Sequence, residues 1–148
     1  MFAPLKGRKV IDLTQVLAGP YCSYQLGLLG ADVIKVEPQD GGDWARIGGP
    51  DAALSDAGLA SGFLTQNAGK RSIAIDLKQP AGVALVLDMI GQADVFLENF
   101  RPGTAARLGL DVATVQARNP SIVYASLSAY GQDGPMGGRP AYDHVIQA

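Results

Sequence analysis

The sequence predicts an α/β fold built on a mostly parallel sheet, and three observations lead to this prediction. Short apolar runs rich in β-branched residues recur along the 148-residue chain. Helix-forming stretches separate them, at the spacing of successive strand–helix–strand units. The composition, 47% hydrophobic and 18% charged, is typical of a globular chain that is long enough to bury a core. We therefore expect one domain.

Residues 8–37 form the first strand–helix–strand unit. It consists of a strand over 9–13, a loop over 15–19, a helix over 21–29 and a strand over 31–36. Pro20 suits the first helical position because its missing N–H has no partner there. Gly30 then ends the helix as a left-handed residue. In parallel sheets the loop after such a strand faces the helix N-terminus, where anions bind, so residues 15–19 are the loop of interest.

The middle of the chain, residues 39–68, shows no sustained periodicity and is punctuated by glycines. An irregular segment of this length is uncommon inside a compact domain, so we expect a functional or mobile loop. Only its end, residues 61–67, suggests a short helix.

The second half returns to alternating strands and helices. Its clearest helix opens at Pro80 and closes at Gly91, and one buried face is predicted by the spacing of Val83, Val86, Leu87 and Ile90. The other expected elements are strands over 71–77, 93–97 and 121–128, helices over 104–108 and 112–117, and a glycine- and proline-rich loop over 131–140.

Charge and composition exclude several classes of function. The formal net charge of −2 gives no electrostatic reason to expect nucleic acid or a membrane surface as a partner. No apolar run approaches the roughly 20 residues that span a bilayer, and the amino terminus does not resemble a signal peptide, so we expect a cytoplasmic location. One cysteine and one histidine suggest neither an internal disulfide nor a metal site. We expect Cys22 to be a buried, inert thiol.

Common nucleotide-binding and nucleophile motifs are missing. Ala18-Gly19-Pro20 stands where a G-x-G-x-x-G fingerprint would follow the first strand, which disfavours an ordinary NAD-binding domain. Asp12 and Asp76, at strand ends, are interpreted as caps or turn residues. Basic residues lie near predicted element ends, namely Lys70, Arg71, Lys78, Arg101, Arg107 and Arg139. Singly these are surface charges, but several converging on one cleft would suit a phosphorylated ligand.

A series of ordered motifs resembles the class III CoA-transferases, which include formyl-CoA transferase, carnitine CoA-transferase and the α-methylacyl-CoA racemases. The motifs are Val10-Ile11-Asp12-Leu13-Thr14 with Ala18-Gly19-Pro20, the block 29–37, Asn67-x-x-Lys70-Arg71-Ser72, Ala93-Asp94-Val95, Glu98-Asn99-Phe100-Arg101-Pro102-Gly103, Leu108-Gly109, Asn119-Pro120 and Gly131-Gln132-x-Gly134-Pro135. The resemblance implies a Rossmann-like, mostly parallel sheet with helices on both faces, in chains that interlock as a dimer. Residues 1–148 correspond to the amino-terminal part of the family's large domain.

The resemblance also implies contacts with coenzyme A. Leu17 and Ala18 match loop residues beside CoA, and Ile75 and Lys78 match the segment at its adenosine end. Asn99, Phe100, Arg101 and Arg107 match positions around the nucleotide and its phosphates. Tyr142, with Arg139 close by, matches a residue near the pantetheine and thioester end. Pro38 departs from the family, since some transferases carry an arginine there.

The implied activity is transfer of CoA from an acyl-CoA to a carboxylic acid acceptor through an aspartyl–acyl anhydride and an aspartyl–CoA thioester, without a cofactor. Family members place the nucleophilic aspartate after the last block of this chain, so we expect it beyond Ala148. Asp143 is accordingly interpreted as structural, and the segment alone is expected to be inactive. Residues 142–148 break off in mid-pattern, which suggests a fragment of a longer protein that forms a homodimer.

Two alternatives to a transferase stay open. One is an acyl-CoA α-epimerase, which is disfavoured because Tyr142 replaces the racemase histidine and His144 lies two positions on. The other is a non-catalytic fragment that binds CoA or associates with a partner chain.

Overall fold

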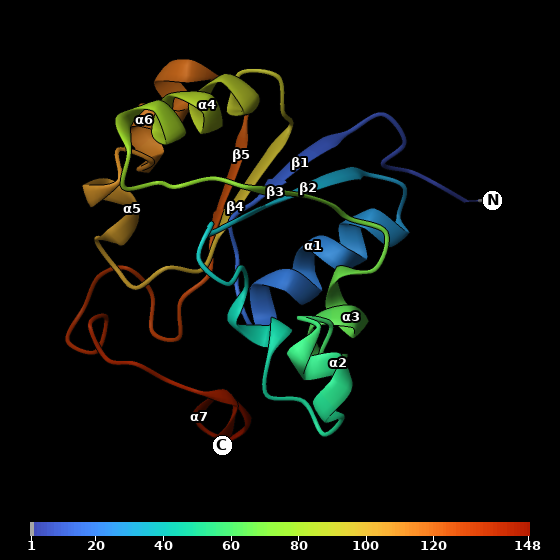
Figure 1. Ribbon diagram of the computed structural model, residues 1–148. Helices are drawn as coiled ribbons and strands as arrows, with labels where there is room; N and C mark the ends of the chain where they lie inside the picture. Colours follow the sequence, from blue (N-terminus) through green and yellow to red (C-terminus); the bar gives the residue numbers. More distant parts are fainter. Residues whose placement is uncertain (1) are drawn as a thin grey trace.

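The computed structural model describes residues 2–148 and contains a five-stranded, all-parallel sheet in the order β3-β2-β1-β4-β5 (Figure 1). The strands are β1 (Lys9–Asp12), β2 (Asp32–Glu37), β3 (Arg71–Ala74), β4 (Val95–Glu98) and β5 (Val123–Ser126). In register, Val10 of β1 lies between Val33 of β2 and Val95 of β4. The predicted α/β fold with a parallel sheet is therefore confirmed.

Helices cover both faces of this sheet. They are α1 (Ala18–Leu28), α2 (Ala52–Asp56), α3 (Ser61–Asn67), α4 (Pro80–Ile90), α5 (Thr104–Arg107), α6 (Val112–Arg118) and α7 (Asp143–Gln147), with the 3-10 helix η1 (Trp44–Arg46). In Figure 1, α4, α5 and α6 lie together on one side of the strands, and α1, α2 and α3 lie on the other. None of the helices in residues 2–148 is long and apolar enough to cross a membrane.

The face under α4 and α6 holds the main apolar core. Alternate strand residues point toward it, so Ile11 and Leu13 follow one another on this face while Val10 and Asp12 point to the opposite one. From α4, Val86 and Ile90 are fully buried against Phe96. The predicted helical face is confirmed, with Val83 and Leu87 packed partly buried at its margin.

The face under α1 is divided along its length. Near the beginning of the strands a small apolar cluster of Val10, Val33 and Leu97 packs against α1. Toward the carboxyl ends the same face carries charged residues, since Asp12, Lys35 and Glu37 are all at most 3% exposed. A buried ionic layer therefore lies directly behind the carboxyl edge of the sheet.

Three sequence expectations change. Helix α1 begins at Ala18, two residues before Pro20, because any residue in the first turn can dispense with its N–H. The irregular segment 39–68 holds η1 and α2 as well as the expected α3. Both missed elements are too short to show periodicity, yet each begins at an aspartate whose side chain accepts a backbone N–H, Asp43 and Asp51. Strand β3 ends at Ala74, where its pairing with Glu37 of β2 ends, and not at residue 77.

Candidate functional site

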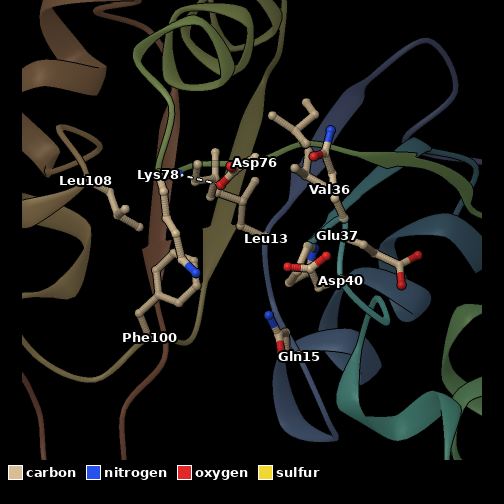
Figure 2. A pocket seen from close by; sticks show the side chains of 13 residues that line it. Leu13, Gln15, Val36, Glu37, Asp40, Asp76, Lys78, Phe100 and Leu108 are labelled. Atoms are coloured by element: carbon tan, nitrogen blue, oxygen red, sulfur yellow. Dashed lines mark hydrogen bonds between the residues drawn. The ribbon is translucent and has the colours of Figure 1, made fainter.

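A cleft of about 420 Å³ opens at the carboxyl edge of the sheet (Figure 2). The end of β2 and the segments that follow β1, β2, β3 and β4 line it, through Leu13, Gln15, Val36, Glu37, Pro38, Gln39, Asp40, Ile75, Asp76, Leu77, Lys78, Phe100 and Leu108. Figure 2 shows Phe100 and Leu108 on one side and Val36, Glu37 and Asp40 on the other. This is where parallel α/β sheets bind ligands, and the volume lies within the range of small-molecule sites.

The lining of the cleft is mostly apolar with a few charged groups. Lys78 is its one basic residue within the part of the chain that the structure describes, and its backbone N–H donates to Asp76 Oδ1 at 2.9 Å. Phe100 presents an aromatic ring, and its N–H donates to the buried Glu98 carboxylate at 2.8 Å. Three acidic residues, Glu37, Asp40 and Asp76, also line the cleft. The apolar walls suit an aromatic ring, and Lys78 is the group there that favours an anionic substituent.

Two loops border the cleft and are joined by a reciprocal amide contact. Asn99 Oδ1 accepts the Gln15 N–H at 2.8 Å, and Asn99 Nδ2 donates to the Gln15 carbonyl at 2.8 Å. The loop after β1 is thus fixed to the loop after β4. Just beyond it, α1 lies so close to the loop after β1 that a side chain at Gly19 would overlap Thr14, which accounts for glycine in the Ala18-Gly19-Pro20 sequence.

Buried charges support the loop after β1 from behind. The Lys35 ammonium donates to the Thr14 carbonyl at 2.6 Å and lies 2.8 Å from the Asp43 Oδ2 atom. The other oxygen of Asp43 accepts the N–H groups of Val16, at 3.0 Å, and of Ala45. The loop is therefore held by side chains from β2 and from the segment that follows it.

Glu37, at the end of β2, ties this segment to β3. Its carboxylate accepts from Arg46 at 2.6 and 2.7 Å, from Ser72 Oγ at 2.5 Å and from the Asp43 N–H at 2.8 Å. Burial alone would raise the pKa of Glu37, but the hydrogen bonds from Arg46 and Ser72 outweigh it and lower the pKa to about 2. Because Arg46 and Ser72 already occupy this carboxylate, Glu37 is not free to bind a ribose hydroxyl as the acidic residue of a dinucleotide site does.

A second ionic cluster lies under the start of α1. Lys70 Nζ lies 3.0 Å from Asp12 Oδ2 and also donates to Ser23, Asn67 and the Pro20 carbonyl. Burial lowers the pKa of Lys70, although the Asp12 carboxylate opposes this shift. Asp12 Oδ1 also accepts the Thr14 N–H at 2.8 Å, the contact expected of a turn residue, so that interpretation of Asp12 is confirmed. The interpretation of Lys70 as a surface charge is wrong. Both side chains are at most 3% exposed, and together they anchor α1 to β1.

The ten residues proposed to contact CoA fall into three groups. Ile75, Lys78 and Phe100 line the cleft. Leu17 and Asn99 belong to the two loops joined at Gln15, and Ala18 is the first residue of α1. Arg101, Arg107, Arg139 and Tyr142 are exposed and do not line the cleft, and Tyr142 immediately precedes α7, which lies apart from the sheet in Figure 1.

The basic residues do not converge on this cleft. Of the six singled out in the sequence, only Lys78 lines it. Lys70 is buried against Asp12, Arg71 pairs with Asp32 at 2.5 Å, and Arg107 donates to Thr104 at 2.7 Å. Cys22 is partly buried, and this burial raises the pKa of its thiol, which agrees with an inert side chain.

Asp143, at the carboxyl-terminal end of the chain, is the acidic residue nearest in sequence to the expected nucleophile. Asp143 is exposed on α7, where its Oδ2 accepts a hydrogen bond from Gln147, and it does not line the cleft. The helix ends at Gln147, and Ala148 is the residue that follows it. An aspartate beyond Ala148 falls outside the described residues 2–148, so that expectation stays a prediction.

Sequence reasoning missed the residues that support the site from behind. Lys35 lies within a predicted strand, where alternation places it on one face but does not indicate its partner. Asp43 lies in the segment expected to be irregular. Its one local signal was the pattern of an aspartate that starts a helical turn, and this pattern does not predict the contact with Val16.

Comparison with known proteins shows to which family the chain is similar. The family model described as CoA-transferase family III matches residues 5–148. The chain is 44% identical over 147 residues to the succinate–glutarate CoA-transferase of Agrobacterium fabrum, covering 97% of this chain and 37% of that protein. It is 45% identical to the acetyl-CoA:oxalate CoA-transferase of Acetobacter aceti, covering 98% and 36%. A CaiB/BaiF family protein from Brucella suis has a similar structure, with a TM-score of 0.89 and 41% identity over 99% of this chain and 39% of that one. The chain thus spans a little over a third of the length of these relatives.

Proposed function

The chain belongs to CoA-transferase family III, and from this premise we propose that it supplies the CoA-binding part of an enzyme that moves CoA between carboxylic acids. The similar proteins from Agrobacterium and Acetobacter are named for transfer of CoA to or from succinate, glutarate, acetate and oxalate, which supports an acyl-CoA donor and a carboxylic acid acceptor.

One observation carries the assignment of the CoA site. Ile75 and Lys78, from the segment after β3, and Phe100, from the segment after β4, were matched to the nucleotide end of CoA and line one cleft. The Phe100 ring and the aliphatic wall suit a purine, and the Lys78 ammonium suits a phosphate. The first turn of α1, whose N–H groups after Leu17 have no acceptor within the helix, is suited to the pyrophosphate.

The proposed chemistry assigns no nucleophile to the described residues. Asp143, the acidic residue next to the matched Tyr142, is engaged with Gln147 on the exposed helix α7. We propose that the chain binds and orients CoA, while an aspartate beyond Ala148, contributed by a longer form of the protein, attacks the thioester. That longer form is proposed to be a homodimer located in the cytoplasm. Light scattering after size exclusion would test the homodimer by its molar mass.

Measuring the binding of CoA to the 148-residue chain tests the proposal that this chain holds the CoA site. We expect isothermal titration calorimetry to detect binding, and Phe100→Ala or Lys78→Ala to weaken it by about tenfold or more, the loss of one buried ring or one charged contact. Lys6→Ala, which removes an exposed lysine outside the cleft, serves as the control. Equal affinities of all four proteins would place the site elsewhere, and absence of binding by a folded chain would contradict the assignment.

Measuring transfer activity tests the proposal that the nucleophilic aspartate lies beyond Ala148. Succinyl-CoA incubated with the chain and either glutarate or oxalate is expected to remain unchanged by liquid chromatography and mass spectrometry. Formation of glutaryl-CoA or oxalyl-CoA by the purified chain would show that one of its own carboxylates is the nucleophile.

A further inference from the structure

The loop after β1 contains an unusual backbone conformation. Val16 has a φ of +72°, and it is the one non-glycine residue among residues 2–148 with a positive φ. A β-branched side chain disfavours this left-handed region, so the surrounding structure must hold Val16 in it. The conformation matters because Leu17, the residue that precedes α1, directly follows.

Three side chains hold three consecutive residues of this loop by their backbones. Lys35 contacts the Thr14 carbonyl, Asn99 contacts Gln15 on both of its backbone polar groups, and Asp43 accepts the Val16 N–H. Of these three side chains, Asp43 is the one that holds the left-handed residue itself.

Asp43 is built into its position more firmly than a helix cap requires. Its carboxylate is fully buried, pairs with Lys35 at 2.8 Å, and belongs to a residue whose own N–H donates to Glu37. Asp51, which caps α2 in the same segment, also accepts a backbone N–H at the start of its helix, from Leu54, but its side chain is exposed. Capping of η1 therefore does not explain the burial and the charge pair of Asp43.

We propose that Asp43 is a positioning residue of the CoA site, which acts by holding Val16 in the left-handed conformation and so placing Leu17 and the first turn of α1 at the cleft. This inference rests on the proposed function. It makes the turn that begins at Asp43 part of the support of the site, although Asp43 does not line the cleft.

The test uses Asp43→Asn, which keeps the size of the side chain. The amide has one acceptor, so its NH₂ group must face either the Lys35 ammonium or the Val16 N–H, donor against donor. We expect CoA affinity to fall about tenfold. Adding Val16→Gly should restore it to within about threefold of the wild type, because glycine adopts a positive φ without the carboxylate. Asp51→Asn, the matched change in the same segment, should leave the affinity unchanged.

Hydrogen exchange gives a readout that does not depend on CoA. In Asp43→Asn the Val16 amide should exchange faster, while the Gln15 amide, held by Asn99, should not change. If Asp43→Asn alone does not fold, the double variant Asp43→Asn with Val16→Gly carries the test, and a folded double variant whose CoA affinity is about tenfold below the wild type would overturn the positioning role.

The outcomes separate the two proposals. Faster exchange at Val16 with unaltered CoA affinity would overturn the positioning role and leave the CoA site standing. Reduced affinity that Val16→Gly does not restore would mean that Asp43 acts only through general stability. A folded wild type that binds no CoA would remove the proposed function, and the positioning role with it.

Discussion

The two faces of this sheet are stabilised in different ways. Beneath α4 and α6 the face is mostly apolar, with Ile90, Phe96 and Leu110 completely buried. Its buried carboxylate, Glu98, accepts hydrogen bonds from Tyr124 and the Phe100 N–H and pairs with no basic residue among those that the structure describes. Beneath α1 and α3 it is apolar at one end only. Toward the carboxyl edge it becomes ionic, with Asp12 against Lys70 and Lys35 against Asp43. The same five strands therefore carry a conventional core on one face and a layer of paired charges on the other.

This difference follows the position of the candidate site. Apolar packing is non-directional and tolerates small shifts, whereas buried ion pairs and hydrogen bonds fix the position of particular backbone atoms. The ionic layer contacts Thr14 and Val16, which belong to the loop after β1, and also the segment after β2. We infer that the apolar face supplies most of the folding stability and that the ionic face sets the shape of the carboxyl edge.

The largest expected effect comes from removing one partner of a buried ion pair. Lys35→Met keeps the length of the side chain but leaves the Asp43 carboxylate buried without its countercharge. We expect a loss of about 3–5 kcal/mol in the free energy of unfolding, measured with urea. Lys9→Met, on the exposed end of the neighbouring strand β1, should change it by less than about 0.5 kcal/mol. Similar values for the two variants would remove the distinction between the faces.

Acid should weaken the ionic face selectively. The pKa of Glu37 in the folded chain is about 2, against an ordinary value of 4.5. Because the folded pKa is the lower one, the stabilisation is fully present above about pH 5 and is lost as the pH falls toward 2. It amounts to about 3 kcal/mol at most. Unfolding midpoints measured at a series of pH values should fall less steeply for Glu37→Gln than for the wild type, and parallel curves would contradict the assignment.

The apolar face should respond to lost volume and not to pH. Ile90→Val removes one methylene from a completely buried position in α4. The expected cost is about 0.5–1.5 kcal/mol, the same at pH 7 and pH 4. Denaturant titrations at the two pH values check this. A cost that grew on acidification would indicate that the two faces are coupled.

The smallest effect is expected at the surface. Arg118 pairs with Asp88 at 2.9 Å, with side chains 50% and 70% exposed. Arg118→Ala should cost less than about 1 kcal/mol, and high salt should reduce this further. Thermal unfolding at low and high salt provides the measurement. A cost as large as that of Lys35→Met would mean that burial does not govern the value of ion pairs in this protein.

Sequence reasoning succeeded on the apolar face for a physical reason. Val86 and Ile90 repeat with the period of a helix, and the strands are runs of β-branched residues, so local pattern and final structure agree. The loop at the carboxyl end of β1 could be singled out in the same way, because parallel sheets place ligand sites there.

The ionic face could not be derived in this way. Lys35 and Asp43 lie on either side of an irregular segment that contains Gly41 and Gly42, and Asp12 and Lys70 lie 58 positions apart. No local sequence rule predicts either pair. The irregular appearance of residues 39–60 came from structure held by these long-range contacts and not by periodicity. Ile75, Lys78 and Phe100 became candidates through the family resemblance, and their common cleft became visible only in the fold.

The order of the strands leaves the sheet open at both margins. β3 pairs only with β2, and β5 only with β4, among the residues that the structure describes. Each margin thus offers backbone groups on which a further strand can add. On β3 the Arg71 side chain, paired with Asp32, places charge at this margin, whereas β5 starts with Val123, which is 60% exposed. At high protein concentration, self-association is therefore expected to start at β5, and Val123→Lys would be the simplest way to keep the chain monodisperse.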